Sequence, residues 1–216
     1  MTDAYTDELF TLEGADRLVF PVSRLLVDPE RFRDDHDEIM ASRGMGAVYT
    51  HTHDGRLLRP VDDREAVLRT FYDPHHQRLE IWAAQALNTF GDCLLVDCHS
   101  FPDQPLPCDL NHEVPRPDVC IGTDDVHTPS FLAQEAISWL KSGGVSVWLD
   151  KPYRGSIVPS CCYRKDAHVS TLMIELNRRL YMDELSGLRS PAFAETAAMT
   201  SRLLNHLASA FRETRV

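Results

Sequence analysis

Short apolar runs alternate along this chain with longer segments whose apolar residues recur at helical spacing. The apolar runs predict β-strands at 18–22, 46–50, 93–97, 119–122, 145–149 and 169–176. The helical spacing predicts α-helices at 65–72, 74–90, 130–141 and 193–212. Strands interleaved with helices in this way are typical of βαβ units. We therefore expect an α/β fold with a mostly parallel, mixed sheet that is covered by helices.

Proline and glycine residues mark the boundaries of several of these elements. Pro74 stands where a first-turn proline is tolerated, so it predicts that a second helix starts there. Gly91 predicts the C-cap of that helix, and Gly143-Gly144 predicts the end of the helix at 130–141. The sequence contains neither an internal repeat nor a low-complexity linker. We therefore expect residues 1–216 to form a single domain.

The composition limits the kinds of partner. Hydrophobic residues make up 43% and charged residues 25% of the 216 positions, which is ordinary for a globular domain with a sizeable core. The formal charge of -11 argues against nucleic acid and anionic membranes, but it allows a small anionic substrate held by local arginines. No apolar run approaches the roughly 18–20 residues of a membrane span. Six cysteines in a chain with an acidic, non-signal-like start predict reduced thiols in the cytoplasm.

The predicted strand at 93–97 ends in an abrupt change from apolar to polar residues. Its sequence continues as LLVDCHS, in which Asp97 and His99 are two positions apart and would project from one face of a strand. A carboxylate so placed can orient an imidazole, as it does beside many metal-ligating histidines. Strand carboxyl ends are also where open α/β sheets bind ligands. The segment predicts a metal or acid–base site, and the alternative is a strand cap that only satisfies the turn.

A second polar residue interrupts the apolar strand at 169–176. An ionised Glu175 within a Leu/Met/Ile run would be costly unless it is paired or functional. Partial desolvation would raise its pKa toward neutrality, which suits a general base. The alternative is a structural ion pair with Arg178 or Arg179.

Three arginines stand near predicted strand ends. Arg24, Arg31 and Arg154 suit bidentate capture of a carboxylate if they converge on one edge of the sheet. Individually, each could equally form a surface ion pair with nearby acids.

The histidines outside this segment offer weaker signals. His51 and His53 share a strand face but lie beside a turn, so metal binding there is the less favoured interpretation. Only one residue of the pair His75-His76 can face the sheet edge from a helix, and we expect it to be His76, in neutral form near the helix N-terminus. Residues predicted to be on the surface are His127, His168 and His206.

Eight segments, in order along the chain, resemble the N-formylglutamate amidohydrolase family. They are TDAYTDELF at 2–10, FPVSRLLVDP at 20–29, GMGAVYT at 44–50, PHHQRL at 74–79, LVDCHSFP at 95–102, PDVCIGT at 117–123, KPYRGSIVP at 151–159 and MIELNRRLYMDE at 173–184. The resemblance implies a zinc-peptidase-like architecture (phosphorylase/hydrolase-like) and metal-dependent hydrolysis of an N-acyl amino acid. The substrate it implies is N-formyl-L-glutamate, which would yield formate and L-glutamate.

The resemblance also implies roles for individual residues. By matching position, His99 and Asp3 resemble ligands of one Zn²⁺ ion, and Glu175 resembles the general base acting on the metal-bound water. Arg24 resembles a catalytic and substrate-binding residue. The remaining substrate contacts we expect are Arg31, Arg154, Tyr153, His76 and Asn177.

The start of the sequence departs from the family pattern. Family members usually begin with a strand ending in a Pro-His-Ser-Gly-like element, which supplies another zinc-binding histidine. This sequence starts at Met1-Thr2-Asp3 and carries Ala4 in place of a bulky residue. We therefore expect a sheet lacking its first strand, with an exposed edge, and a weak or absent metal site. The alternatives are a non-catalytic member that binds acyl or acidic amino acids, and an amidase for another acyl group.

Overall fold

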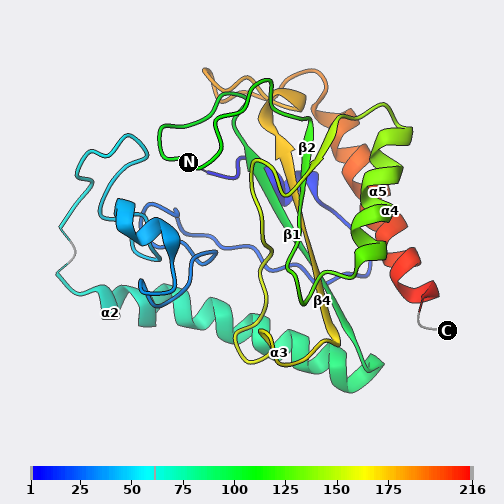
Figure 1. The fold of residues 1–216 in the computed structure, drawn as a ribbon, viewed down its shortest axis with the longest axis horizontal. Coiled ribbons are helices and arrows are strands. Elements are labelled where there is room, and N and C mark those ends of the chain that lie inside the picture. The colour runs from blue at the N-terminus through cyan, green and yellow to red at the C-terminus, as the bar shows by residue number, and fades with distance from the viewer. Residues whose placement is uncertain (1, 61, 215–216) are drawn as a thin grey trace.

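The computed structural model describes residues 2–60 and 62–214. Its strands are β1 (Cys93–Phe101), β2 (Val119–Gly122), β3 (Val147–Leu149) and β4 (Val169–Asn177). They form one four-stranded sheet in the order β1-β4-β2-β3. The pairs β1·β4 and β2·β3 are parallel, whereas β2 runs antiparallel to β4. The sheet is therefore mixed and mostly parallel, as the sequence predicts, and β1 lies at one edge of it (Figure 1).

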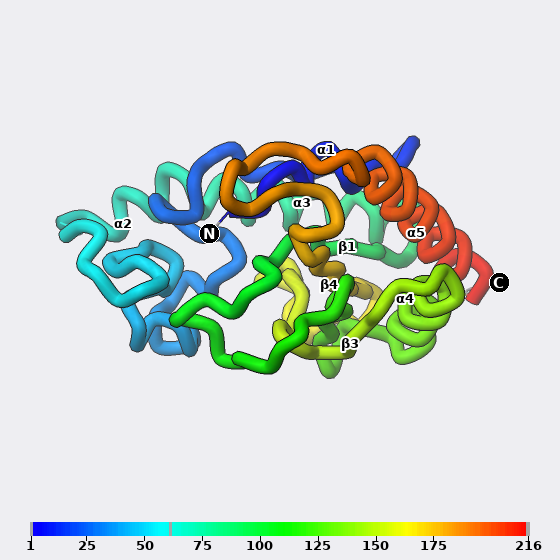
Figure 2. The backbone as a smooth tube through the Cα atoms, turned by 90° about the horizontal axis from the view of Figure 1, so that it is seen from above, coloured from blue at the N-terminus to red at the C-terminus, as the bar shows by residue number. Residues whose placement is uncertain are grey.

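Helices lie on both sides of this sheet. The longer ones are α3 (Asp73–Phe90), α4 (Ser130–Ser142) and α5 (Phe193–Glu213). The shorter ones are α1 (Thr6–Leu9), η1 (Ile39–Arg43), α2 (Arg64–Val67), η2 (Leu68–Tyr72) and η3 (Arg178–Leu180). Helices α4 and α5 pack together at one end of the molecule, and α2 lies at the other (Figure 2). None of the helices in the described part of the chain is long and apolar enough to cross a membrane.

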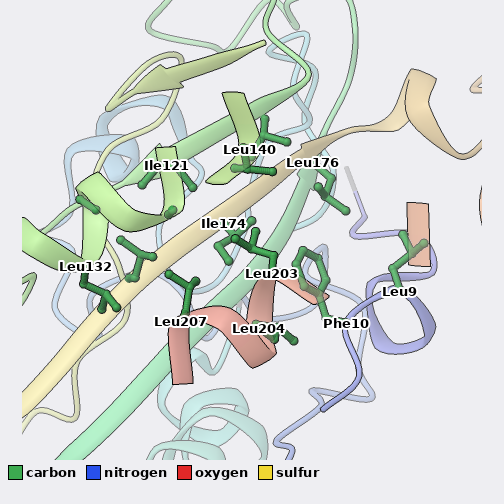
Figure 3. Close-up of a cluster of buried hydrophobic side chains, with 14 of the residues drawn as sticks. Leu9, Phe10, Ile121, Leu132, Leu140, Ile174, Leu176, Leu203, Leu204 and Leu207 are labelled. Carbon is green, nitrogen blue, oxygen red and sulfur yellow. The ribbon is translucent and has the colours of Figure 1, made fainter. Parts of the chain in front are cut away.

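The main hydrophobic core fills the space between one face of the sheet and the helices α4 and α5. From β4, alternate residues enter this core because successive side chains of a strand point to opposite faces. Leu172, Ile174 and Leu176 are fully buried there. Figure 3 shows Ile174 and Leu176 among these buried side chains. Leu132, Leu140, Leu203 and Leu207 meet them from the helices.

The opposite face of the sheet carries the polar residues. In the β1·β4 register, His99 is the neighbour of Glu175, and Asp97 is the neighbour of Met173. These four side chains alternate with the residues of the main core, so they share the other face. At the start of the strands, α3 covers that face through Ala83, which packs in a cluster with Cys93 and Val169.

Two of the predicted strands are absent. Residues 18–22 and 46–50 have no strand structure. The second run is nevertheless buried, since Ala47 and Val48 pack in a cluster with Val27, Leu68 and Tyr72. Its apolar side chains are sequestered by loop-to-helix packing, so the apolar run indicates burial and not a sheet partner.

Other boundaries agree with the prediction or extend it. Strand β2 has the predicted bounds, and Gly91 caps α3 with a φ of 81° and an N–H donated to Leu87 O. The predicted break before Pro74 is wrong, because α2, η2 and α3 follow one another without interruption. Strand β1 is longer than predicted, so that Cys98 and His99 lie within the strand and not after it.

Candidate active site

His99 is the centre of the polar face, with a carboxylate on each side of its ring. On one side, Asp97 Oδ1 lies 2.7 Å from Nε2, and Glu30 Oε2 lies 3.7 Å from the same nitrogen. On the other side, Asp3 Oδ2 lies 3.4 Å from Nδ1. Burial alone would lower the pKa of His99, but the charges of Asp97 and Asp3 raise it well above the usual value. The imidazole is therefore held between anions that favour a positive charge at this position.

Asp97 is itself fixed by the backbone of another segment. Its Oδ2 accepts a hydrogen bond of 2.9 Å from the amide of Ile157, in the loop between β3 and β4. The other oxygen faces His99. The spacing of two residues on one strand thus produces the carboxylate–imidazole pair that the sequence predicts, with a loop that fixes the carboxylate.

Asp3 connects His99 to a buried arginine network. Its Oδ1 accepts the amide of Ser100 at 2.8 Å, and its Oδ2 lies 3.0 Å from Arg24 Nη2. Although burial opposes it, Arg24 and His99 hold the pKa of Asp3 below its usual range. Arg24 Nε in turn lies 3.7 Å from Asp28, which is fully buried.

Asp28 joins both predicted arginines of this region. Arg31 Nε lies 3.5 Å from its Oδ2, and the hydroxyl of Tyr49 donates to the same oxygen at 2.7 Å. The structure therefore brings Arg24 and Arg31 to one carboxylate, with Asp3 beside Arg24, although neither arginine follows a strand and Arg154 does not join them.

Glu175 lies beside His99 on the central strand β4. It is 8% exposed, and its Oε2 is buried without a hydrogen-bond partner. Burial raises its pKa to about 7, with the charge of His99 acting in the opposite direction. The structural ion pair considered as the alternative is not formed by either arginine. Arg178 pairs with Glu184, and Arg179 pairs with Asp103 and Asp118.

A cavity of about 1230 Å³ opens beside His99 along the free edge of β1. Its polar end is lined by Asp3, Arg24, Glu30, Asp97 and His99. Elsewhere the lining comes from residues 10–23 and from apolar side chains of α3 and α5, among them Leu79, Trp82, Leu204 and Phe211. Glu175 lies behind this lining, on the neighbouring strand.

Glu30 is the member of this site that the sequence reasoning missed. Together with Asp97 and His99 it forms a group of donors that all lie within 4.8 Å of one another, which could hold a metal ion. Burial and the charge of Asp97 raise its pKa. The available signal was its position directly after the family-like segment at 20–29, but a single glutamate in an acidic chain gives little reason to choose it.

Other predicted substrate contacts lie away from the cavity lining. Arg154 is exposed and pairs with Asp125. Tyr153 bonds through its hydroxyl to Asp109, and Asn177 bonds to Asp103 and to Pro117 O.

Of the adjacent histidines, His75 lines the cavity and His76 does not. His76 Nε2 instead lies 2.8 Å from Pro29 O. Burial lowers the pKa of His75 to about 4, so this ring is neutral near pH 7. The helix, which is continuous from Arg64, therefore presents His75 to the cavity and not the expected His76.

The remaining histidines are placed as follows. His51 bonds to Thr50, and neither His51 nor His53 joins a metal-type cluster among the described residues. His168 is exposed, as predicted. His127 is not on the surface. It is 1% exposed, and its two ring nitrogens bond to Val169 O and to the amide of Arg164.

Comparisons with known proteins identify the family and the fold of this chain. A family model described as N-formylglutamate amidohydrolase matches residues 1–182. The fold is similar to the crystal structure of N-formylglutamate amidohydrolase from Ralstonia eutropha JMP134, with a TM-score of 0.68 and 22% identity over 89% of this chain and 75% of that one. It is also similar to a gene product of Agrobacterium tumefaciens, with a TM-score of 0.59 and 19% identity over 90% of this chain and 69% of that one. None of the curated proteins that were compared with the chain matches it. Because the family model covers most of the sequence, the chain belongs to the N-formylglutamate amidohydrolase family and is a hydrolase of the class that cleaves linear amide bonds.

Proposed function

We propose that the protein hydrolyses N-formyl-L-glutamate, or a closely similar N-acyl acidic amino acid, to the free acid and the amino acid. The observation that carries this proposal is Glu175, a buried carboxyl with an unpartnered oxygen and a pKa of about 7, beside His99. A carboxylate whose pKa lies near the working pH suits general base catalysis. The net charge of -11 agrees with a small-molecule substrate and not with nucleic acid. The six free cysteines agree with a cytoplasmic location.

We infer that a zinc ion would be held by His99 Nδ1 and Asp3. Donors that share a tetrahedral zinc ion lie roughly 3.3 Å apart, given zinc–donor lengths of about 2.0–2.2 Å. The 3.4 Å between Asp3 Oδ2 and His99 Nδ1 fits that spacing. On the other ring nitrogen, the 2.7 Å to Asp97 is a hydrogen-bond distance. This matches the common arrangement in which a metal-ligating histidine donates its second N–H to a carboxylate.

The competing placement is on Nε2, where Glu30 and Asp97 supply two carboxylates. We favour the Nδ1 side because Asp97 lies too close to Nε2 for two donors that share one ion. Catalytic zinc sites usually have three protein ligands, and Asp3 with His99 makes two. We therefore expect zinc to bind weakly.

The proposed reaction assigns a task to each nearby side chain. When bound, zinc supplies a water molecule of lowered pKa and polarises the acyl carbonyl. Glu175 takes the proton of the attacking water and returns it to the departing amino nitrogen. Asp97 keeps the His99 ring in one orientation. Arg24 binds the carboxylate of the substrate, because it lines the cavity, and Asp28 holds Arg31 beside it.

The decisive experiment measures zinc content and formate release together, with two carboxylate variants. The wild-type protein should bind about one zinc ion per chain at saturating metal and release formate from N-formyl-L-glutamate. Asp3→Asn should weaken zinc binding by at least the roughly 10–100-fold that loss of a supporting residue costs, whereas Glu30→Gln should have a smaller effect. The reverse order would move the metal to the Nε2 side.

Asp62→Asn is the matched control, because it removes an exposed carboxylate that is not part of the cavity lining. It should leave both zinc binding and formate release unchanged. Binding of N-formyl-L-glutamate without formate release at saturating zinc would contradict the hydrolase proposal and favour the non-catalytic binder. Hydrolysis of another N-acyl amino acid, without hydrolysis of N-formyl-L-glutamate, would change the substrate that we assign.

A further inference from the structure

Two side chains of the helical segment hold the backbone on both sides of Glu30. His76 Nε2 lies 2.8 Å from the carbonyl oxygen of Pro29, and the hydroxyl of Tyr72 donates to the carbonyl oxygen of Arg31 at 2.8 Å. Glu30 is the residue between these two carbonyls, and its own carboxylate reaches toward His99. The two hydrogen bonds therefore bracket the one residue of this loop that contacts the central imidazole.

The two rings are mutually supporting. Tyr72 and His76 stack with centroids 4.1 Å apart and an interplanar angle of 24°. They are four positions apart, which places them on one face of a helix. Tyr72 is the last residue of the π-helical turn η2, and His76 lies in the first turns of α3. Single π-turns inside α-helices are rare and occur frequently at functional sites.

One ring nitrogen of His76 has no hydrogen-bond partner. Its Nδ1 is buried and makes no hydrogen bond. Because Nε2 faces a carbonyl oxygen, Nε2 must carry the proton. A buried polar atom without a partner is rare and needs an explanation. Here the explanation is that the ring orientation serves the contact to Pro29 O.

We propose that Tyr72 and His76 are positioning residues that clamp the Pro29–Glu30–Arg31 backbone and so fix the Glu30 carboxylate against His99. This inference rests on the proposed function for the importance of His99, but the clamp itself is a property of the chain without metal or substrate. It replaces the substrate-binding role that the sequence analysis gives to His76.

The clamp acts together with Asp28 at the start of the same loop. Asp28 Oδ1 accepts the amide of Glu30 at 3.1 Å, the carbonyl oxygen of Asp28 accepts the amide of Arg31 at 3.3 Å, and Glu38 Oε2 accepts the amide of Phe32 at 3.1 Å. The loop is therefore anchored by three amides and by the two carbonyls that Tyr72 and His76 hold. Losing the carbonyl anchors frees Glu30 to move away from His99 while Asp28 still holds Arg24 and Arg31. The clamp should therefore affect the imidazole side of the site more than the arginine side.

The test uses variants that keep the ring packing and remove only the hydrogen bond. Tyr72→Phe and His76→Phe do this. In metal-free protein both should increase hydrogen exchange at the amides of residues 30–32 on the order of tenfold, while exchange in β4 stays as in the wild type. With zinc, both should lower kcat by roughly 10-fold with a smaller change in KM. His76→Gln places an amide N–H near the position of Nε2 and should restore both readouts.

His206→Phe is the matched control, since His206 bonds through Nε2 to Glu135 between α4 and α5, away from this loop. It should change neither readout. Wild-type exchange at residues 30–32 in both Phe variants would overturn the clamp. A global increase in exchange that His76→Gln does not rescue would also overturn it, because the role would then be only structural. Hydrogen exchange is measured without substrate. If the wild type released no formate, the proposed function would be wrong, but the exchange data would still decide whether the clamp exists.

Discussion

The environment of Glu175 is the strongest indication of a catalytic role for a single residue. The sequence places a carboxyl inside an apolar strand, where it must be paired, neutral or functional. The structure removes the first option, because Arg178 and Arg179 pair with other acids. Burial then leaves a carboxyl that titrates near neutrality, beside His99 and within reach of the charges of Asp3 and Arg24.

Glu175→Gln should abolish formate release, with a loss on the order of 10²–10⁴-fold, and should leave zinc binding intact. The amide has the same shape but cannot accept a proton. Turnover and zinc titration of the variant beside the wild type provide the measurement. Unchanged turnover would rule out Glu175 as the base.

The same variant should show a pH effect on stability in metal-free protein. The folded-state pKa of Glu175 is raised from 4.5 to about 7, so folding favours the neutral carboxyl. That contribution is present below about pH 4.5 and is lost as the pH rises to 7 and above. Denaturant unfolding from pH 4 to 8 should therefore show the wild type losing about 3 kcal/mol relative to Glu175→Gln. A constant difference across this range would contradict the raised pKa.

Among the elements, the close approach of β2, β4 and the loop between β3 and β4 shapes the site. Gly122 ends β2 opposite Met173 of β4. A Cβ atom at this position would meet Met173 Cε at 2.3 Å and the carbonyl oxygen of Gly155 at 2.6 Å. Gly155 lies in the loop that carries Ile157, the amide donor to Asp97. The glycine thus lets that loop lie close over the polar face of the sheet.

Gly122→Ala should destabilise the protein by about 1–3 kcal/mol, because the methyl group forces the loop backbone outward. It should also lower activity, since the amide of Ile157 moves away from Asp97. Gly143→Ala is the control, because a Cβ there would meet Leu140 O at 3.4 Å, which is ordinary contact. Equal unfolding free energies for the two variants would show that the close approach has no energetic weight.

At the scale of the whole molecule, burial sorts the six cysteines. Cys161 is exposed, Cys98 is half-buried, and the other four are buried in different parts of the chain. Burial raises the pKa of Cys93 to about 11 and of Cys120 to about 12. Since the thiolate is the reactive form, these groups resist modification in the folded protein.

Titration with a thiol reagent at pH 8 should show one fast thiol in the native protein and all six after unfolding in denaturant. Cys161→Ser should remove the fast phase. Rapid reaction of more than two thiols in the folded wild type would contradict the burial pattern. Slow reaction of Cys98, which lines the cavity, should become slower still when substrate is bound.

Local features of this protein, namely its class, several of its elements and one pair of side chains, can be predicted from the amino-acid pattern. The alternation of apolar runs and helical segments predicts the α/β class, β2, and the approximate extent of α4 and α5, because these follow from side-chain periodicity. The spacing of Asp97 and His99 likewise predicts their pairing, since strand geometry places alternate residues on one face. The sequence pattern indicates Glu175 and Arg24 as candidates, and the family resemblance adds Asp3. The single-domain assignment stays a prediction.

Contacts between residues far apart in the sequence depend on the packing of the folded chain. Glu30 reaches His99 from a loop about 70 positions earlier in the chain. Residues 46–50 look like a strand but pack as an irregular segment, and His75 faces the cavity where His76 was expected. The periodicity of apolar residues indicates which face of a helix or strand is buried, but not which other element packs against that face. The partner, the rotation of a helix and the burial that sets a pKa come from long-range packing, which the local pattern does not encode.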